Sequence, residues 1–154
     1  MLSLMFQLDE DRYALDAAQI VEVLPLVTVK KTPRAPHGLA GYFNYRGGPV
    51  PLVDLAELML GRPTRAHLSS RIILTSMSKK CELPQLIGLL AENVTEIIRR
   101  EPSDLISSGI GRDGVSYLGP ILTFAGDFVQ CIQVDMLLPK ELLELLTGQL
   151  VERA

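Results

Sequence analysis

The sequence is poor in the residues that carry most enzyme chemistry and metal binding. Its 154 residues include no tryptophan, two cysteines and two histidines, and aromatic residues make up only 5%. Cys81 and Cys131 form no Cys-x-x-Cys pair and no Cys/His cluster with metal-ligand spacing. Neither a disulfide framework nor a metal site is therefore expected, and both cysteines are interpreted as small apolar side chains in a reducing compartment.

Long hydrophobic runs and an excess of positive charge are also lacking. No stretch approaches the roughly 18 to 20 apolar residues that cross a bilayer. The first twelve residues have no basic segment before their apolar stretch and meet three acids by position 11, unlike a signal peptide. Fifteen basic against eighteen acidic residues give a net charge of −3, which argues against binding to a phosphate backbone. We therefore expect a cytoplasmic protein that neither inserts into membranes nor binds nucleic acid.

What is present is enough apolar sequence to bury a core. Apolar residues make up 47% of the chain, which excludes a mostly disordered protein. Apolar runs separated by polar turns predict a hairpin over residues 4–15, a strand at 20–24, and two strands around a Gly-Gly turn within 39–55. A two-turn helix is predicted next, with Asp54 suited to cap its start and Gly61 to end it.

Two parts of the chain resemble each other at a constant offset of 74 residues. Residues 87–98 laid under residues 13–24 place similar side chains together. The matched positions include Ala14 with Gly88, Leu15 with Leu89, Glu22 with Glu96, and Val23 with Ile97. Self-similarity between halves of this length predicts two copies of one small β unit. Two packed β-barrels are expected, because closure removes the exposed sheet edges that short strands otherwise leave.

The boundaries of the two units follow from a polar connector at residues 61–70. The first unit is expected at about residues 15–75, and the second at about 76–138 together with the N-terminal strand. In the tail, leucines recur with a helical period, which predicts an amphipathic helix over 139–152 that packs on a barrel. We treat residues 1–154 as a single domain.

Two functions other than partner binding stay open. One is a small enzyme that uses Cys131 or Cys81 as nucleophile with His37 or His67 as base, although Cys131 lies in an alternating strand where it is expected to be inert. The other is a nucleic-acid-binding barrel, which lacks the surface aromatics that single-strand binders use. Its basic face would consist of Lys30, Lys31, Arg34, Arg46, Arg62, Arg65 and Arg71. Asp54 and Asp135 each follow an apolar strand and are interpreted as caps of the next turn, not as a catalytic pair.

The most distinctive motif is the turn Asn44-Tyr-Arg46-Gly47-Gly48 between two apolar strands. Its glycines allow positive φ, so the turn can present Arg46 as a rigid fork of donors. Such a fork suits a carboxylate on another protein, while a merely solvated turn charge is the alternative.

With this turn and several other motifs, the sequence resembles the CheW-like domain, the adaptor fold that couples methyl-accepting receptors to the histidine kinase CheA in bacteria. The resemblance rests on Phe6-x-Leu8, Tyr13-Ala-Leu15, Ile20-Val-Glu-Val-Leu24, Pro33 and Pro36 before Gly41, Asn44-x-Arg46-Gly47, Val50-Pro-Leu-Val-Asp54-Leu55, Ile87-Gly-Leu-Leu, Val94-Thr-Glu-Ile-Ile98 and Asp135-x-Leu-Leu138. It implies a mainly β fold of two five-stranded SH3-like barrels, no enzymatic activity and no cofactor.

The same resemblance implies two partners. One barrel would dock on the regulatory domain of a CheA-type histidine kinase, and a groove between the barrels would receive the cytoplasmic tip of a methyl-accepting chemoreceptor, with a higher-order array also open. Ile20 would supply apolar contact, Glu22 and Arg46 would orient partners through charged hydrogen bonds, and the glycines would set the backbone. For Ile20 and Gly41 a purely structural role is equally open. The partner-binding residues predicted in this way are Ile20, Glu22, Gly41, Asn44, Arg46 and Gly47.

Overall fold

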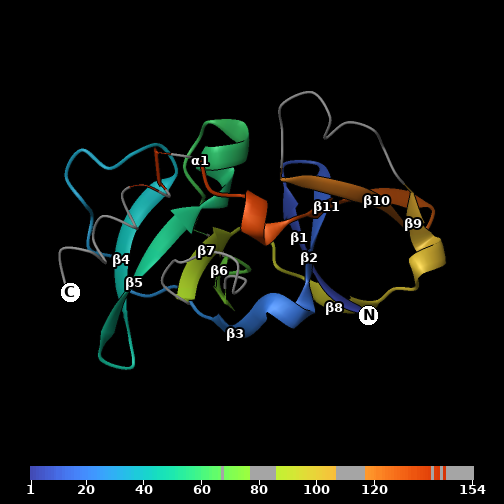
Figure 1. The fold of residues 1–154 in the computed structure, drawn as a ribbon, viewed down its shortest axis with the longest axis horizontal. Helices are drawn as coiled ribbons and strands as arrows, with labels where there is room; N and C mark the ends of the chain where they lie inside the picture. Colours follow the sequence, from blue (N-terminus) through green and yellow to red (C-terminus); the bar gives the residue numbers. More distant parts are fainter. Residues whose placement is uncertain (67, 77–85, 107–116, 140, 143, 145–154) are drawn as a thin grey trace.

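The chain folds into two β-sheets that pack against each other (Figure 1). The structure is a computed structural model that describes residues 1–66, 68–76, 86–106, 117–139, 141–142 and 144. A six-stranded sheet has the strand order β8-β1-β2-β11-β10-β9, and a five-stranded sheet has the order β3-β6-β7-β5-β4. The prediction of a mainly β fold with two similar units is confirmed.

The six-stranded sheet combines strands from both ends of the chain, and the five-stranded sheet is formed by the stretch between them. The six-stranded sheet contains β1 (Leu2–Leu8), β2 (Asp11–Asp16), β8 (Glu96–Arg99), β9 (Leu105–Ile106), β10 (Leu118–Phe124) and β11 (Asp127–Ile132). The five-stranded sheet contains β3 (Ile20–Leu24), β4 (Leu39–Tyr45), β5 (Gly48–Asp54), β6 (Arg71–Ser76) and β7 (Leu86–Ala91). The helical segments are α1 (Leu55–Leu60) and the short 3-10 helices η1 (Ala17–Gln19), η2 (Pro102–Asp104) and η4 (Val134–Met136).

The predicted helix and its caps are confirmed. The Asp54 side chain accepts a hydrogen bond from the backbone N–H of Glu57, and Gly61 ends α1 in the left-handed conformation with φ +76°. The matching interpretation of Asp135 is wrong, because the cap position of η4 is Gln133. Asp135 lies within η4 and accepts a hydrogen bond from the side chain of Gln19, 116 residues away.

The predicted repeat corresponds to the two places where the chain changes sheet. One change runs from β2 through η1 to β3, and the other runs from β7 to β8. In each copy the strand before the change has a parallel partner, which is the later strand β11 for β2 and the earlier strand β5 for β7. Ala14 lies opposite Cys131 in the six-stranded sheet, and its repeat partner Gly88 lies opposite Leu52 in the five-stranded sheet. The offset found in the sequence is therefore the offset between two equivalent crossings.

Strand membership differs from the boundaries predicted for the two units. β2 belongs with β1 in the six-stranded sheet, whereas β7 belongs with the earlier strands β5 and β6 in the five-stranded sheet. The reason is pairing: β6 and β7 form an antiparallel ladder from Arg71–Ala91 to Ser76–Leu86, which keeps β7 in the sheet of its predecessor. Of the predicted helix over 139–152, most lies outside the described residues, but Leu142 is fully buried.

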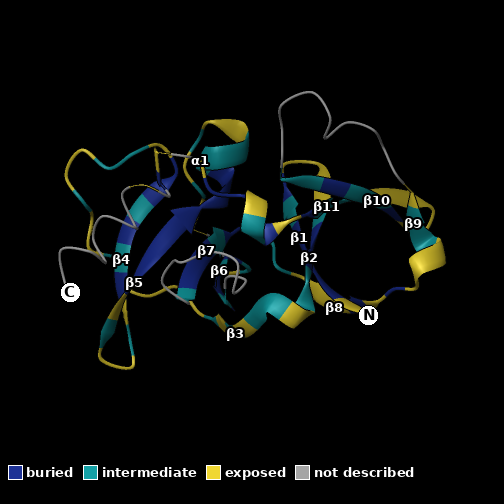
Figure 2. Cartoon of the chain, viewed as in Figure 1, coloured by how far each residue is buried: buried dark blue, intermediate teal, exposed yellow. Residues whose placement is uncertain are grey.

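The core has three parts, and the buried residues that form them are dark blue in Figure 2. The largest cluster lies between the sheets and combines residues of both, such as Leu4, Phe6, Val53, Ile73 and Leu89. A second cluster lies on the other face of the six-stranded sheet around Met5, Leu122 and Val129. A third lies on the other face of the five-stranded sheet around Phe43, Leu52 and Ile72. Burial of the central cluster is what holds the two sheets together.

The five-stranded sheet curls so that its two edges meet. Lys30, six residues beyond the end of β3, exchanges two backbone hydrogen bonds with Tyr42 of β4, at 2.8 and 2.9 Å. Since β3 and β4 are the outer strands of this sheet, the bridge links its opposite sides. Full SH3-like barrel geometry in both sheets stays a prediction.

Candidate partner-binding surfaces

The β4–β5 hairpin carries four of the six predicted partner-binding positions. Its two loop residues, Arg46 and Gly47, have φ +50° and +87°, the pattern of a type I′ turn. The side chain of Asn44 accepts a hydrogen bond of 2.8 Å from the Gly47 N–H and stabilises the turn. The glycines were expected to supply the positive φ, but Arg46 itself adopts the left-handed conformation.

Glu22, Tyr45 and Arg46 form a connected chain of polar contacts. The Tyr45 hydroxyl donates a 2.8 Å hydrogen bond to Glu22 Oε2, and the Arg46 guanidinium carbon lies 5.2 Å from the centre of the Tyr45 ring. The hydrogen bond to Glu22 raises the pKa of Tyr45. Because Glu22 is on β3 and Tyr45 on β4, this contact also joins the two edges of the sheet. We call Glu22, Asn44, Tyr45, Arg46 and Gly47 the Arg46 surface.

Gly41 has a structural role. Its φ is +142°, and a Cβ atom at this position would lie 2.1 Å from the backbone oxygen of Lys30. The close approach is the bridge between Lys30 and Tyr42 that closes the sheet. Glycine is therefore required for backbone packing, whatever its part in partner binding.

Ile20 lies on a different face from Glu22. The register of β3 against β6 shifts between them, so that Ile20 lies opposite Thr75 and Glu22 opposite the next residue, Leu74. Adjacent strand residues face opposite sides, and the shift sends Ile20 onto the central cluster and away from the Arg46 surface. Of the predicted positions, the structure thus brings together Glu22, Asn44, Arg46 and Gly47, but not Ile20.

Sequence reasoning missed a second exposed surface that is apolar. Val21 and Val23 on β3 are 51% and 40% exposed, and Leu2 on β1 and Ile97 on β8 are 47% and 59% exposed. Val23 lies opposite Ile73, and Ile97 lies opposite Leu4, so both share a face with the central cluster. β3 and β8 run along the same lower side of the molecule in Figure 1. We call Leu2, Val21, Val23 and Ile97 the apolar margin. The match of Val23 with Ile97 in the sequence repeat was the signal from which this surface could have been predicted.

Nothing described in the structure supports the enzyme alternative. Burial raises the pKa of the Cys131 thiol, which makes a thiolate nucleophile less available. His37 lies beside Glu57, with Nδ1 3.7 Å from Oε1. Cys81 and His67 lie outside the described residues. Within the described ranges, no group of three His, Cys, Asp or Glu side chains is placed to hold a metal ion, and no helix there is long and apolar enough to span a membrane.

A charged network ties down one of the two crossings and uses one of the predicted basic residues. Arg62 makes hydrogen bonds of 2.7 and 3.0 Å to the Glu92 carboxylate and 2.8 Å to Asp9. The backbone N–H of Arg65 also donates to Glu92, which is only 2% exposed. These hydrogen bonds, those from Arg62 first, lower the pKa of Glu92. Arg62 is therefore occupied within the fold and is not part of a free basic face.

Comparison with known proteins supplies the class of the fold. Residues 3–142 match the CheW-like domain family. The chain is 22% identical over 144 residues to the chemotaxis protein CheW of Rhizobium meliloti, covering 88% of this chain and 86% of that protein. It is 23% identical over 100 residues to CheW of Helicobacter pylori, covering 65% of this chain and 58% of that protein. The fold matches the scaffolding protein TtCheW of Thermoanaerobacter tengcongensis with a TM-score of 0.77 and 23% identity, over 92% and 89% of the two chains.

The two-sheet fold is the one shared with TtCheW, and the family match spans strands of both sheets. The chain belongs to the CheW-like domain family. Its function is that of a chemotaxis coupling adaptor, as the resemblance noted in the sequence implies.

Proposed function

We propose that this adaptor is non-catalytic, works in the cytoplasm, and couples a CheA-type histidine kinase to methyl-accepting chemoreceptors through two separate surfaces. The Arg46 surface receives the regulatory domain of the kinase. The apolar margin receives the cytoplasmic tip of the receptor. The observation that carries the proposal is the pairing of one polar and one apolar exposed surface on different faces of β3.

The Arg46 surface suits a partner that presents carboxylates. Arg46 is exposed at the tip of a tight two-residue turn, and its guanidinium lies over the Tyr45 ring, which limits the conformations that binding must select. Its remaining donors can form charged hydrogen bonds that set the orientation of a partner. A depression of about 680 Å³ beside the turn, lined by Lys30, Tyr42 and Pro49 among others, offers apolar contact area next to them.

The apolar margin suits a partner that buries aliphatic side chains. Val21 and Val23 are β-branched residues exposed near an edge of the sheet, a position where isolated soluble domains avoid apolar side chains. Contact here would extend the central cluster outward, with modest area and fast exchange. Assembly of many copies with kinase and receptor in an array would then supply the avidity.

The test is a binding measurement with purified kinase regulatory domain and purified receptor cytoplasmic fragment. Arg46→Ala should weaken binding to the kinase domain by about tenfold or more and leave receptor binding unchanged. Val23→Ser should weaken binding to the receptor fragment and leave binding to the kinase domain unchanged. Ala125→Arg, which places arginine in the equivalent turn of the other sheet, and Phe128→Ser, which removes an exposed apolar side chain from β11, serve as controls and should change neither affinity. Equal effects of Arg46→Ala on both partners would overturn the assignment of surfaces.

Absence of catalysis by cysteine is tested separately. Because burial raises the pKa of Cys131, iodoacetamide should label this thiol in the native protein more slowly than in the protein unfolded by urea. Labelling at Cys131 that is as fast in the native protein as in urea would favour the enzyme alternative.

A further inference from the structure

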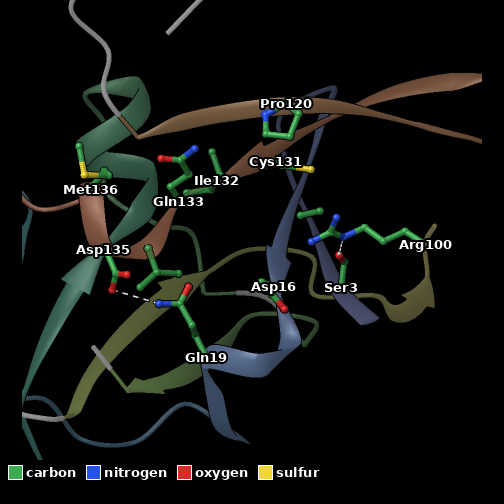
Figure 3. A pocket seen from close by; sticks show the side chains of 12 residues that line it. Ser3, Asp16, Gln19, Arg100, Pro120, Cys131, Ile132, Gln133, Asp135 and Met136 are labelled. Carbon is green, nitrogen blue, oxygen red and sulfur yellow. Dashed lines mark hydrogen bonds between the residues drawn. The ribbon is translucent and has the colours of Figure 1, made fainter. Parts of the chain in front are cut away.

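A cavity of about 510 Å³ opens on the six-stranded sheet, and its lining residues include none of the Arg46 surface or of the apolar margin (Figure 3). Its walls come from β1, β2, β10 and β11, from the short helices η1 and η4, and from the residue that follows β8. The polar side chains that line it include Ser3, Asp16, Gln19, Arg100, Cys131 and Asp135. The volume is that of a small-molecule site in a protein of this size.

The repeat shows which side chains occupy the equivalent place in the five-stranded sheet. Ser3 lies opposite Asp16 in the β1–β2 ladder, and Ile72 lies opposite Leu90 in the equivalent β6–β7 ladder. In the parallel ladders, Cys131 lies opposite Ala14, and Leu52 lies opposite Gly88, so Cys131 and Leu52 are equivalent positions. Where the six-stranded sheet has Ser3, Asp16 and Cys131, the five-stranded sheet therefore packs Ile72, Leu90 and Leu52 into its own cluster. Smaller and polar side chains leave the space open.

Arg100 supplies a buried positive charge at one end of this cavity. It is only 8% exposed, and its Nε donates a 2.6 Å hydrogen bond to Ser3 Oγ. Figure 3 shows its guanidinium directed into the cavity. Among the residues that the structure describes, no carboxylate forms an ion pair with it. Burying a guanidinium is costly unless an anion compensates for the lost hydration.

Acidic side chains line the part of the cavity away from Arg100. Figure 3 shows Gln19 and Asp135 at the opposite end, with Asp16 between them and Arg100. Asp16 Oδ1 accepts a 3.0 Å hydrogen bond from the Ala18 N–H, and Asp135 Oδ1 accepts one of 3.0 Å from Gln19 Nε2. Both carboxylates are thus held in place on that side. Ile132 and Val134 form part of the apolar wall between the two charged ends.

We propose that this cavity binds a small zwitterion of the amino-acid type. The carboxylate of the ligand pairs with Arg100, its ammonium group pairs with Asp16, and an aliphatic body packs on Ile132 and Val134. Bidentate pairing with a carboxylate satisfies the terminal guanidinium donors of Arg100, which have no hydrogen-bond partner among the described residues. A simple anion would meet the Asp16 carboxylate in the same cavity, and a simple cation would meet Arg100, so each binds more weakly than a molecule carrying both charges.

The test uses three probes of one shape on the full chain. They are L-leucine, 4-methylpentanoate, which lacks the amino group, and 3-methylbutylamine, which lacks the carboxylate. Saturable shifts of the Ala14 and Cys131 backbone amides in two-dimensional NMR spectra report binding. We expect L-leucine to bind, and each of the other two to bind about tenfold more weakly, because each loses one charged pair. Equal affinity for 4-methylpentanoate and L-leucine, or saturable binding of none of the three, would overturn the proposal.

Matched variants locate the site. Arg100→Met removes the charge but keeps an unbranched apolar stem, and it should abolish the shifts caused by L-leucine. Arg99→Met, one residue earlier and exposed on β8, should leave them unchanged. Cys131→Leu copies the residue of the five-stranded sheet, fills the cavity without removing Arg100, and should also abolish binding while the spectrum stays that of a folded protein. Equal shifts in wild type and in Cys131→Leu would overturn the assignment to this cavity.

Discussion

The two sheets of this protein share one strand plan and differ in what they place on it. The strand order is β3-β6-β7-β5-β4 in the five-stranded sheet, and the equivalent strands of the six-stranded sheet have the order β8-β1-β2-β11-β10. In both sheets the third and fourth strands of this order are parallel, and the other neighbours are antiparallel. The five-stranded sheet fills its own cluster with Phe43, Leu52 and Ile72. In the six-stranded sheet, the residues equivalent to Leu52 and Ile72 are Cys131 and Ser3, and both line the polar cavity. Backbone pairing thus sets the fold, while side-chain choice decides which copy is closed and which is open.

The comparison extends to the two equivalent turns. Arg46 and Gly47 join β4 to β5 with φ +50° and +87°, and Ala125 and Gly126 join β10 to β11 with φ +52° and +77°. The backbone of the turn is therefore independent of whether arginine or alanine occupies its first position. The arginine is an addition to a turn that the fold makes in any case, as expected for a residue that serves binding.

The largest effect is expected at the bulge that both sheets share. Gly41→Val should destabilise the protein by at least ~3 kcal/mol, because its Cβ would overlap the Lys30 backbone at a positive φ. Pro120 is the equivalent residue in the six-stranded sheet, and Pro120→Ala should cost less than ~1 kcal/mol. Urea unfolding of both variants measures the difference. Similar losses of unfolding free energy in the two variants would contradict this difference between the bulges.

The next effect concerns how each sheet fills the space beside its parallel pair. A Cβ added to Gly88 would lie 2.6 Å from Phe43, whereas the equivalent residues of the other sheet are Ala14 and Leu122. Gly88→Ala should therefore cost ~2 kcal/mol. Phe43→Leu, which copies the other sheet, should recover at least ~1 kcal/mol of that loss in the double variant, as measured by a double-mutant cycle. Additive losses would contradict the proposed equivalence.

The two crossings are held in different ways, and this makes one of them sensitive to pH. Glu92→Gln should destabilise the protein by ~2 kcal/mol at pH 7, because Arg62 loses its buried charged partner. The pKa of Glu92 is lowered in the folded protein, so its contribution is present above the unfolded pKa and is lost as pH falls through the folded value. Unfolding free energies of wild type and Glu92→Gln should therefore converge in acid. The exposed Glu96→Gln is the control, and a gap that persists in acid would refute the mechanism.

The smallest effect is expected at the Arg46 turn itself. Arg46→Ala should change the free energy of unfolding by less than ~0.5 kcal/mol, since Ala125 adopts the same conformation in the other turn. Thermal unfolding of Arg46→Ala and of Ala125→Arg should give melting temperatures close to that of wild type. A clear loss of stability in Arg46→Ala would mean that Arg46 serves folding more than binding.

Local features were predictable from the sequence, and long-range ones were not. The hairpins, α1 and its cap Asp54 follow from residue patterns over a few positions. Sheet membership of β7 depends on its pairing with both β6 and β5, and the contact of Glu22 with Tyr45 depends on closure of the sheet. The bulge that turns Ile20 away from Glu22 is likewise a property of strand register, which the pattern of β3 does not specify.

The two changes of sheet also determine when each half of the molecule can be completed during synthesis. The five-stranded sheet lacks β7 until the ribosome has made residue 91, although its other strands end at residue 76. The hairpin β1–β2 is made first, yet its neighbour β11 ends at residue 132. The six-stranded sheet cannot be finished from one continuous piece of chain, whereas all strands of the five-stranded sheet lie within residues 20–91 and can pair while the other sheet still lacks β8 to β11.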